Sequence, residues 1–322
     1  MNHITRNDKW LVGICSLMHF LVDGLCVCTL YLMSWPFTLR NLFGIFLTYN
    51  LLAFITQPLT GYLADRLRHR QWLLLTSVGL LALAVVMCIA VTSFEALKTS
   101  WMAMFVVASL LGMGNSLFHV WGGKLTAVNT GNDIRALGVF VATGAFGLSV
   151  GLLFYSWWLL VVFLLLIVCA MMLAMRIEVR DHSRKPDFVP RRIPLLVVWL
   201  SIVALMSFVM FRSYVGQSFT TAMVKTEVVV LMVGAVSMIG KMAGGWVAKW
   251  LGIVWSMVAI VVVVGLCLLF KGTGMPVLWL GLFAINCTMP ITLYLANLVM
   301  PGREGLAFGL LAAALMPGYL LS

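Results

Sequence analysis

Charged residues are scarce in this sequence. Only 10% of its 322 residues are Asp, Glu, Lys or Arg, whereas a soluble domain contains roughly a quarter. Such a chain cannot cover a water-facing surface, which excludes soluble enzymes and soluble binding modules. Apolar residues make up 63% of the chain, so we expect an all-α polytopic membrane protein whose solvent is the lipid bilayer.

Several chemical signatures are absent as well. The seven cysteines lie inside apolar runs and form no CxxC pair, which argues against a disulfide framework and a zinc site. There is no Walker loop, HExxH motif or nucleophile elbow. The net charge of +11 is not arranged as one basic stripe with interleaved aromatics, so no nucleic-acid partner is expected. We therefore predict no catalytic residues, no metal and no cofactor.

Apolar runs dominate what is present. Each of these runs can cross the roughly 30 Å of hydrocarbon in a bilayer. The eleven runs cover approximately 10–33, 41–63, 72–92, 101–124, 136–155, 157–176, 194–216, 226–248, 252–270, 276–299 and 305–322. The first is longer than the apolar core of a signal peptide and lacks a small-residue cleavage site, which predicts a retained first helix.

One sizeable polar segment divides the runs. It predicts an N-terminal six-helix bundle at 1–176, a cytoplasmic linker at 177–193 and a C-terminal bundle at 194–322. Similar sequences, Gly61-Tyr-Leu-Ala-Asp65 and Gly245-Trp-Val-Ala-Lys249, close corresponding runs and favour a six-plus-six duplication. A duplication predicts a twelfth helix that the sequence lacks. Truncation and a natural eleven-helix form both stay open.

Basic residues between the runs predict the orientation. With a cytoplasmic N-terminus, 16 of the 21 Lys and Arg residues fall inside, Lys124 and Lys241 among them. We therefore expect an N-terminus on the cytoplasmic side. The short loops and missing tails suggest a bacterial inner membrane.

The segment Gly61-Tyr-Leu-Ala-Asp-Arg-Leu-Arg-His-Arg70 resembles the signature loop between helices two and three of the major facilitator superfamily. Arg68 replaces the usual glycine. The resemblance implies a two-bundle fold with six helices plus five or six. It also implies that Gly61, Asp65, Arg66 and Arg70 latch the cytoplasmic side in one conformation. Asp65 suits that role because a carboxylate can cap a neighbouring helix N-terminus and pair with basic residues.

Two further segments resemble a narrower branch, the fosmidomycin-resistance type of efflux proteins. They are Met18-His-Phe-Leu-Val-Asp-Gly24 and Gly112-Met-Gly-Asn-Ser-Leu-Phe-His119, although Val120 stands where that branch usually has proline. A glycine series, Gly138, Gly144, Gly147 and Gly151, is typical of close helix packing and also resembles the helix-five motif of drug–proton antiporters.

Polar groups inside the apolar runs are the candidate site residues, because each is costly to insert in a membrane. His19 and Asp23 share one helix face, and Asp23 falls near mid-membrane. We predict proton coupling by Asp23, with His19 and His119 as partners. The predicted substrate-binding residues are Asn115, Arg212, Asn286 and Tyr294. In the superfamily, helices one, four, seven and ten line the central cavity, and these residues lie mainly on those four runs.

These features predict a secondary active transporter, not an enzyme, that exports a small organic molecule by proton-coupled alternating access. Its expected partners are the substrate, protons and lipid, and we expect a monomer. Three alternatives stay open. The protein could import or facilitate diffusion of a metabolite, or it could be a transport-inactive membrane subunit or sensor. An intramembrane enzyme would need a catalytic pair that the sequence does not offer.

Overall fold

The computed structural model describes residues 5–34, 39–67, 71–98, 100–177 and 194–321. Within these ranges the chain is helical and contains no strand. The helices in chain order are α1 Arg6–Met33, α2 Leu39–Asn50, the π-helix Leu51–Ile55, α3 Gln57–Arg66, α4 Gln71–Ser93, α5 Glu95–Lys98, α6 Trp101–Asn129, α7 Ile134–Leu153, α8 Trp157–Arg176, α9 Leu195–Thr221, α10 Glu227–Leu251, α11 Ile253–Leu269, the 3-10 turn Lys271–Thr273, α12 Met275–Val299, α13 Glu304–Ala313 and α14 Leu315–Leu320.

The helices reproduce the predicted runs. Nine are long and apolar enough to span a membrane, and two shorter apolar segments, Ile253–Leu269 and Glu304–Leu320, complete the predicted eleven among the described residues. Some details differ from the prediction. α6 continues to Asn129 rather than ending at 124, and α9 continues to Thr221 rather than ending at 216. A π-helical turn interrupts the second run, and the last run divides into α13 and α14.

Side-chain caps explain where many of the helices begin. An N-cap side chain accepts a hydrogen bond from one of the first backbone N–H groups, which have no partner within the helix. The capping residues are Thr5 for α1, Ser100 for α6, Asp133 for α7, Ser156 for α8 and Thr226 for α10. Polar residues at the ends of apolar runs therefore fix where these five helices begin.

The outward faces of the helices are apolar. Large side chains such as Trp158, Leu165, Leu200 and Val262 are exposed over much of their surface. In water such faces would drive aggregation, whereas in a bilayer they meet lipid chains. The confirmed fold class is thus an all-α polytopic membrane protein.

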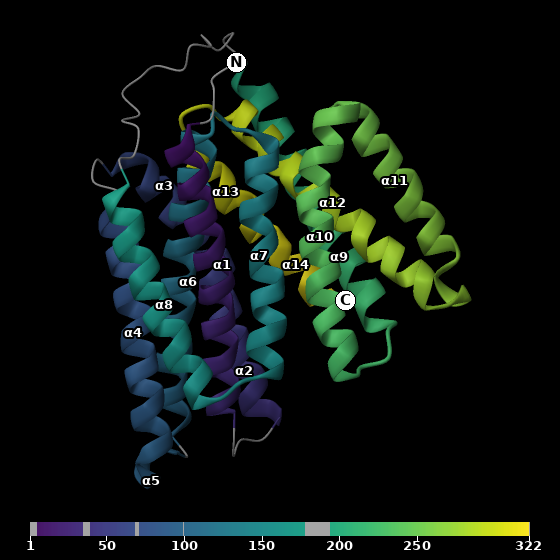
Figure 1. Cartoon of the computed structure of the whole chain (residues 1–322). Helices are drawn as coiled ribbons and strands as arrows, with labels where there is room; N and C mark the ends of the chain where they lie inside the picture. Colours follow the sequence, from purple (N-terminus) through teal and green to yellow (C-terminus); the bar gives the residue numbers. More distant parts are fainter. Residues whose placement is uncertain (1–4, 35–38, 68–70, 99, 178–193, 322) are drawn as a thin grey trace.

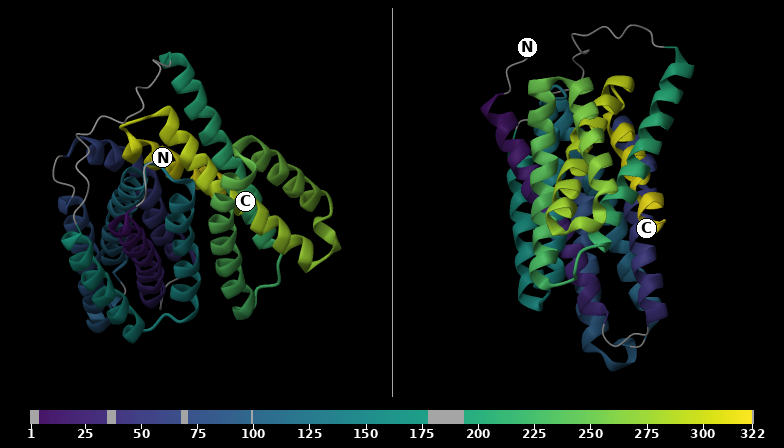
Figure 2. Two further views of the ribbon diagram at one scale, coloured as in Figure 1. Left: turned by 45° about the horizontal axis from the view of Figure 1, so that its top comes forward. Right: turned by 90° about the vertical axis from the view of Figure 1, so that its right-hand side faces the viewer.

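Two groups of helices form the molecule (Figure 1, Figure 2). One core is centred on α1, α4, α6 and α8, and the other on α9, α10, α11 and α12. α7 joins them, because α1 packs on one side of it and α10 on another. α13 lies between the groups and packs on α3 and α6.

The predicted boundaries of the two halves, 1–176 and 194–322, stay a proposal. Residues 178–193 of the predicted linker lie outside the described part of the chain.

Candidate functional site

Asp23 is the centre of a buried polar cluster between α1 and α6. Its Oδ2 lies 3.3 Å from Nε2 of His19, one turn earlier on α1. Its Oδ1 lies 3.5 Å from Nε2 of His119 on α6 and accepts a hydrogen bond of 2.9 Å from Asn115. Asp23 and His119 each lie ten residues, about 15 Å, from the nearer helix end. The cluster is therefore deep in the membrane-spanning region.

The two imidazoles are oriented by backbone carbonyls. Nδ1 of His19 lies 2.7 Å from the Phe140 carbonyl oxygen, and Nδ1 of His119 lies 2.9 Å from the Asn115 carbonyl oxygen. A carbonyl oxygen only accepts hydrogen bonds, so each Nδ1 carries the hydrogen and each Nε2 faces Asp23. If both rings were neutral, two nitrogen lone pairs would face a carboxylate. A proton shared within the cluster removes this repulsion.

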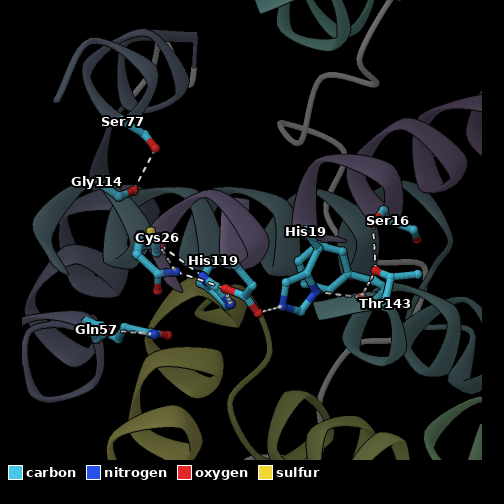
Figure 3. Close-up of polar contacts among 12 residues, drawn as sticks. Ser16, His19, Cys26, Gln57, Ser77, Gly114, His119 and Thr143 are labelled. Atoms are coloured by element: carbon cyan, nitrogen blue, oxygen red, sulfur yellow. Dashed lines mark hydrogen bonds and ion pairs between the residues drawn. The ribbon is translucent and has the colours of Figure 1, made fainter. Parts of the chain in front are cut away.

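Aromatic rings and a glycine enclose this cluster. The rings of His19 and His119 meet edge to face with centroids 4.5 Å apart (Figure 3). Phe118 and Phe140 pack beside His19. On α7, a Cβ at Gly144 would collide with the Asp23 carboxylate and the His19 ring. The glycine series therefore does more than pack helices, because Gly144 makes room for the charged groups.

The same donor set could hold a cation other than a proton. One ligand atom each from His19, Asp23 and His119 lies within 4.8 Å of the others. Two imidazoles and a carboxylate suit divalent transition metals. The sequence predicted these three residues as partners in proton coupling but predicted no metal site, because the spacing of their ligand atoms depends on the rotation of α1 against α6.

Arg212 lies in α9, away from the Asp23 cluster. It is only 6% exposed, and its Nε is buried without a hydrogen-bond partner. Among the described residues, no carboxylate lies within ion-pair distance of its guanidinium, so Arg212 and Asp23 do not pair in this conformation.

Lys241 is a site residue that the sequence analysis missed. It was counted as a cytoplasmic loop charge, yet it lies in α10 ten residues from the nearer end. It is partly buried, and it interacts electrostatically with Arg212, Asp23 and His119. The signal was available, because Lys241 falls within the predicted run 226–248 and not at its edge.

The predicted substrate residues of α12 are not in the Asp23 cluster. Asn286 donates to Ser237 of α10 over 3.4 Å and to the Leu282 carbonyl over 2.8 Å. Tyr294 lies two turns further along, where its carbonyl accepts a hydrogen bond from Asn132 of the α6–α7 connection. Asn286 is thus near Lys241, because Ser237 lies one turn before Lys241 on α10. Tyr294 instead lies beside the α6–α7 connection.

A second polar contact joins α3 to α13. Asp65 at the end of α3 accepts hydrogen bonds from the N–H groups of Gly305 and Leu306, at 3.0 and 2.8 Å. These N–H groups open α13, so a carboxylate sits at a helix N-terminus, where the dipole favours it. Lys124, counted from the sequence as a loop charge, is buried in α6 and pairs with Asp65 at 2.9 Å.

The other predicted latch residues behave differently. A Cβ at Gly61 would collide with the Gly305 backbone, so glycine permits the close contact of α3 with α13. The Arg66 guanidinium stacks 4.3 Å from the Tyr62 ring centroid rather than on α13. Arg70 lies outside the described residues.

Comparison with known proteins agrees with this architecture. The sequence matches the Major Facilitator Superfamily over residues 14–322. It is 28% identical over 156 residues to the fosmidomycin resistance protein of Escherichia coli (strain K12). That alignment spans 46% of this chain and only 36% of the relative.

Solved structures share the fold across nearly the whole chain. The Escherichia coli fucose:proton symporter FucP gives a TM-score of 0.72 at 13% identity, covering 98% of this chain and 90% of that one. The human organic anion transporter MFSD10 gives 0.66 at 16% identity, covering 98% and 92%. Identities this low establish the fold and not the substrate. By its sequence match and its fold, the chain belongs to the Major Facilitator Superfamily, a family of membrane transport proteins rather than enzymes.

Proposed function

We propose that this protein is a proton-coupled secondary transporter that exports a small organic molecule by alternating access. Asp23, His19 and His119 bind and release the coupling proton. The observation that carries the proposal is the orientation of both Nε2 atoms toward one buried carboxylate. Each ring's Nδ1 is held by a carbonyl, so both Nε2 atoms face the carboxylate and are placed to take up a proton.

The direction of transport and the substrate are inferred from a relative. The partial likeness to a fosmidomycin resistance protein favours export, and fosmidomycin is therefore the first compound to test. Residues 1–176 and 194–322 would form two halves that rock about a central site. The protein would lie in a bacterial inner membrane with its N-terminus on the cytoplasmic side.

The contact between α3 and α13 supports alternating access. Asp65 accepts the Gly305 N–H and pairs with Lys124, which ties α3 and α6 to α13 at one end. We propose that this contact is the cytoplasmic latch and that it must open for the site to face the cytoplasm.

The test uses purified full-length protein in proteoliposomes. Compounds that raise its melting temperature, starting with fosmidomycin, are followed for transport with and without an imposed pH gradient. Asp23→Asn should abolish transport driven by the gradient while retaining exchange of labelled for unlabelled compound. Glu227→Gln, which changes an exposed acid at the start of α10, is the matched control and should behave as wild type.

Each alternative has a distinct result in this assay. Accumulation of substrate with the proton flow, rather than against it, would indicate import. Transport indifferent to pH in both wild type and Asp23→Asn would indicate facilitated diffusion. Absence of any exchange with every stabilising compound would indicate a transport-inactive subunit or sensor.

A further inference from the structure

The charges inside the helical bundle do not balance. Among the described residues, Asp23 is the only acidic side chain away from a helix end or a connection. Two basic side chains, Arg212 and Lys241, lie inside α9 and α10, nine and ten residues from the nearer end of their own helix. The oxygens of Asp23 already face His19, His119 and Asn115. No carboxylate of the described chain is left for Arg212.

An uncompensated buried guanidinium is unfavourable. The guanidinium stays charged, and burial of a charge without a partner is strongly unfavourable. Arg212 lies nine residues, about 14 Å, from the end of α9, too far for its side chain to reach the interface. Lys241 adds a second positive charge that repels Arg212. Such a pair is expected where a negatively charged ligand completes the site.

We propose that Arg212 and Lys241 form an anion-binding site and that the transported substrate is a small organic anion. This inference rests on the proposed transport function and adds its substrate class. The guanidinium offers a planar fork that fits a carboxylate or a phosphonate, and the ammonium of Lys241 adds a point charge. Asn286 and Ser237, which are hydrogen-bonded to each other one turn from Lys241, supply neutral polar groups nearby.

The arrangement also predicts selectivity against uncharged compounds. A neutral analogue of the same shape would enter the site but leave the Arg212 guanidinium without a counter-charge. Since an unpaired buried charge is much costlier than a lost neutral contact, discrimination should be large.

The test compares matched pairs of small probes by their effect on the melting temperature of the purified full-length protein. One pair is benzoate with benzamide, and the other is phenylphosphonate with benzenesulfonamide. Both anions should stabilise the wild type, and both neutral partners should not. Equal stabilisation by charged and neutral members of both pairs would overturn the proposal.

Variants test which basic side chains bind the anion. Arg212→Gln and Lys241→Met should each weaken binding of the stabilising anion by about 30-fold or more, as expected for loss of one partner of a buried charge pair. Lys249→Met and Arg176→Gln remove exposed cations near the ends of α10 and α8 and should leave the shift unchanged. Arg212→Lys keeps the charge but loses the planar fork of the guanidinium. Its affinity for the anion should lie between those of the wild type and Arg212→Gln.

The melting temperature in the absence of any probe distinguishes a binding role of Arg212 from a structural role. Because Arg212 has no partner, Arg212→Gln should melt at or above the wild-type temperature in the absence of anions. A lower melting temperature, with anion shifts retained, would show a structural arginine and reject the site. If instead anions bind as predicted but no compound is transported, the anion site stands and the proposed transport function fails.

Discussion

His119 on α6 and Asp23 on α1 place an imidazole nitrogen and a carboxylate oxygen 3.5 Å apart in the interior of the membrane-spanning region. Each group alone would be costly there. Together with His19 they form a unit in which one bound proton satisfies several atoms. We expect the protonation state of this unit, rather than of any single residue, to follow the transport cycle.

His119→Gln should uncouple the transporter. Removal of one of the two imidazoles takes away a group that is placed to carry the proton beside Asp23, so gradient-driven transport should fall at least about tenfold, as for loss of a positioned acid–base group. Exchange of labelled for unlabelled compound should persist. Thr143→Val is the control, because it removes a neighbouring polar contact to the Ser16 carbonyl without removing a titratable group (Figure 3). Equal loss in both variants would point to general disruption of the α1–α7 contact.

Gly144→Ala should damage the same cluster without removing any polar atom. The added methyl group would meet the Asp23 carboxylate and the His19 ring, which must then move off their carbonyl and imidazole partners. We expect loss of gradient-driven transport with folded protein still obtained, because the colliding atoms belong to side chains. Gly13→Ala on α1 adds the same group where no atom lies within 4 Å, and its activity should match wild type. Full activity of Gly144→Ala would argue against coupling through this cluster.

Asp65→Asn should loosen the contact between α3 and α13. The variant loses the charge that pairs with Lys124 and one of two oxygens that accept N–H groups of α13. Loss of charged hydrogen bonds of this kind is worth about 1.5–3 kcal/mol, which corresponds to a 10-fold to 100-fold shift in a conformational equilibrium. A cysteine introduced at the buried Thr60 should react faster with a water-soluble maleimide in this background.

The matched variant for this experiment is Gly61→Ala, which separates the same helices by bulk rather than charge. It should also increase labelling at position 60. If neither variant changes the labelling rate, the α3–α13 contact does not control access to this end of the protein.

Asp133→Ala should lower the melting temperature through loss of the α7 cap. The carboxylate accepts the N–H groups of Arg135 and Ala136 and pairs with the Arg135 guanidinium at 2.7 Å. Burial alone would raise the pKa of Asp133, but the hydrogen bonds and charge of Arg135 outweigh burial and leave the pKa below its ordinary value. An N-cap of this kind is worth about 0.5–2 kcal/mol.

The depressed pKa of Asp133 sets the sign of the pH dependence. Its stabilising contribution is complete above the pKa of the unfolded chain and is lost as the pH falls through the lower folded value. The difference in melting temperature between wild type and Asp133→Ala should therefore be full at pH 7 and should shrink in acid. Asp133→Asn, which keeps a capping oxygen, should lose less. If the difference in melting temperature does not change with pH, the stabilisation comes from capping of α7 and not from the charge of Asp133.

Much of this arrangement could be predicted from the sequence. Spans follow from apolar runs because a bilayer requires about twenty apolar residues, and Asp23, His19 and His119 were identified because ionisable groups are rare there. Lys241 was missed because a count of positive charges assigned it to a loop. The carbonyl partners of the histidines could not be predicted, since they depend on how α1, α6 and α7 rotate against one another.

The π-helical turn Leu51–Ile55 has a consequence for the length of the segment between α2 and α3. A π-helical turn holds one more residue than an α-helical turn. The side chains before and after it therefore point as they would in an α-helix without the extra residue. If the same residues formed an unbroken α-helix, everything after the turn would rotate by about 100° about the axis. Gly61 and Asp65 would then face away from α13. Shortening this stretch by one residue should be tolerated, whereas lengthening it by one should turn the carboxylate away from its partners.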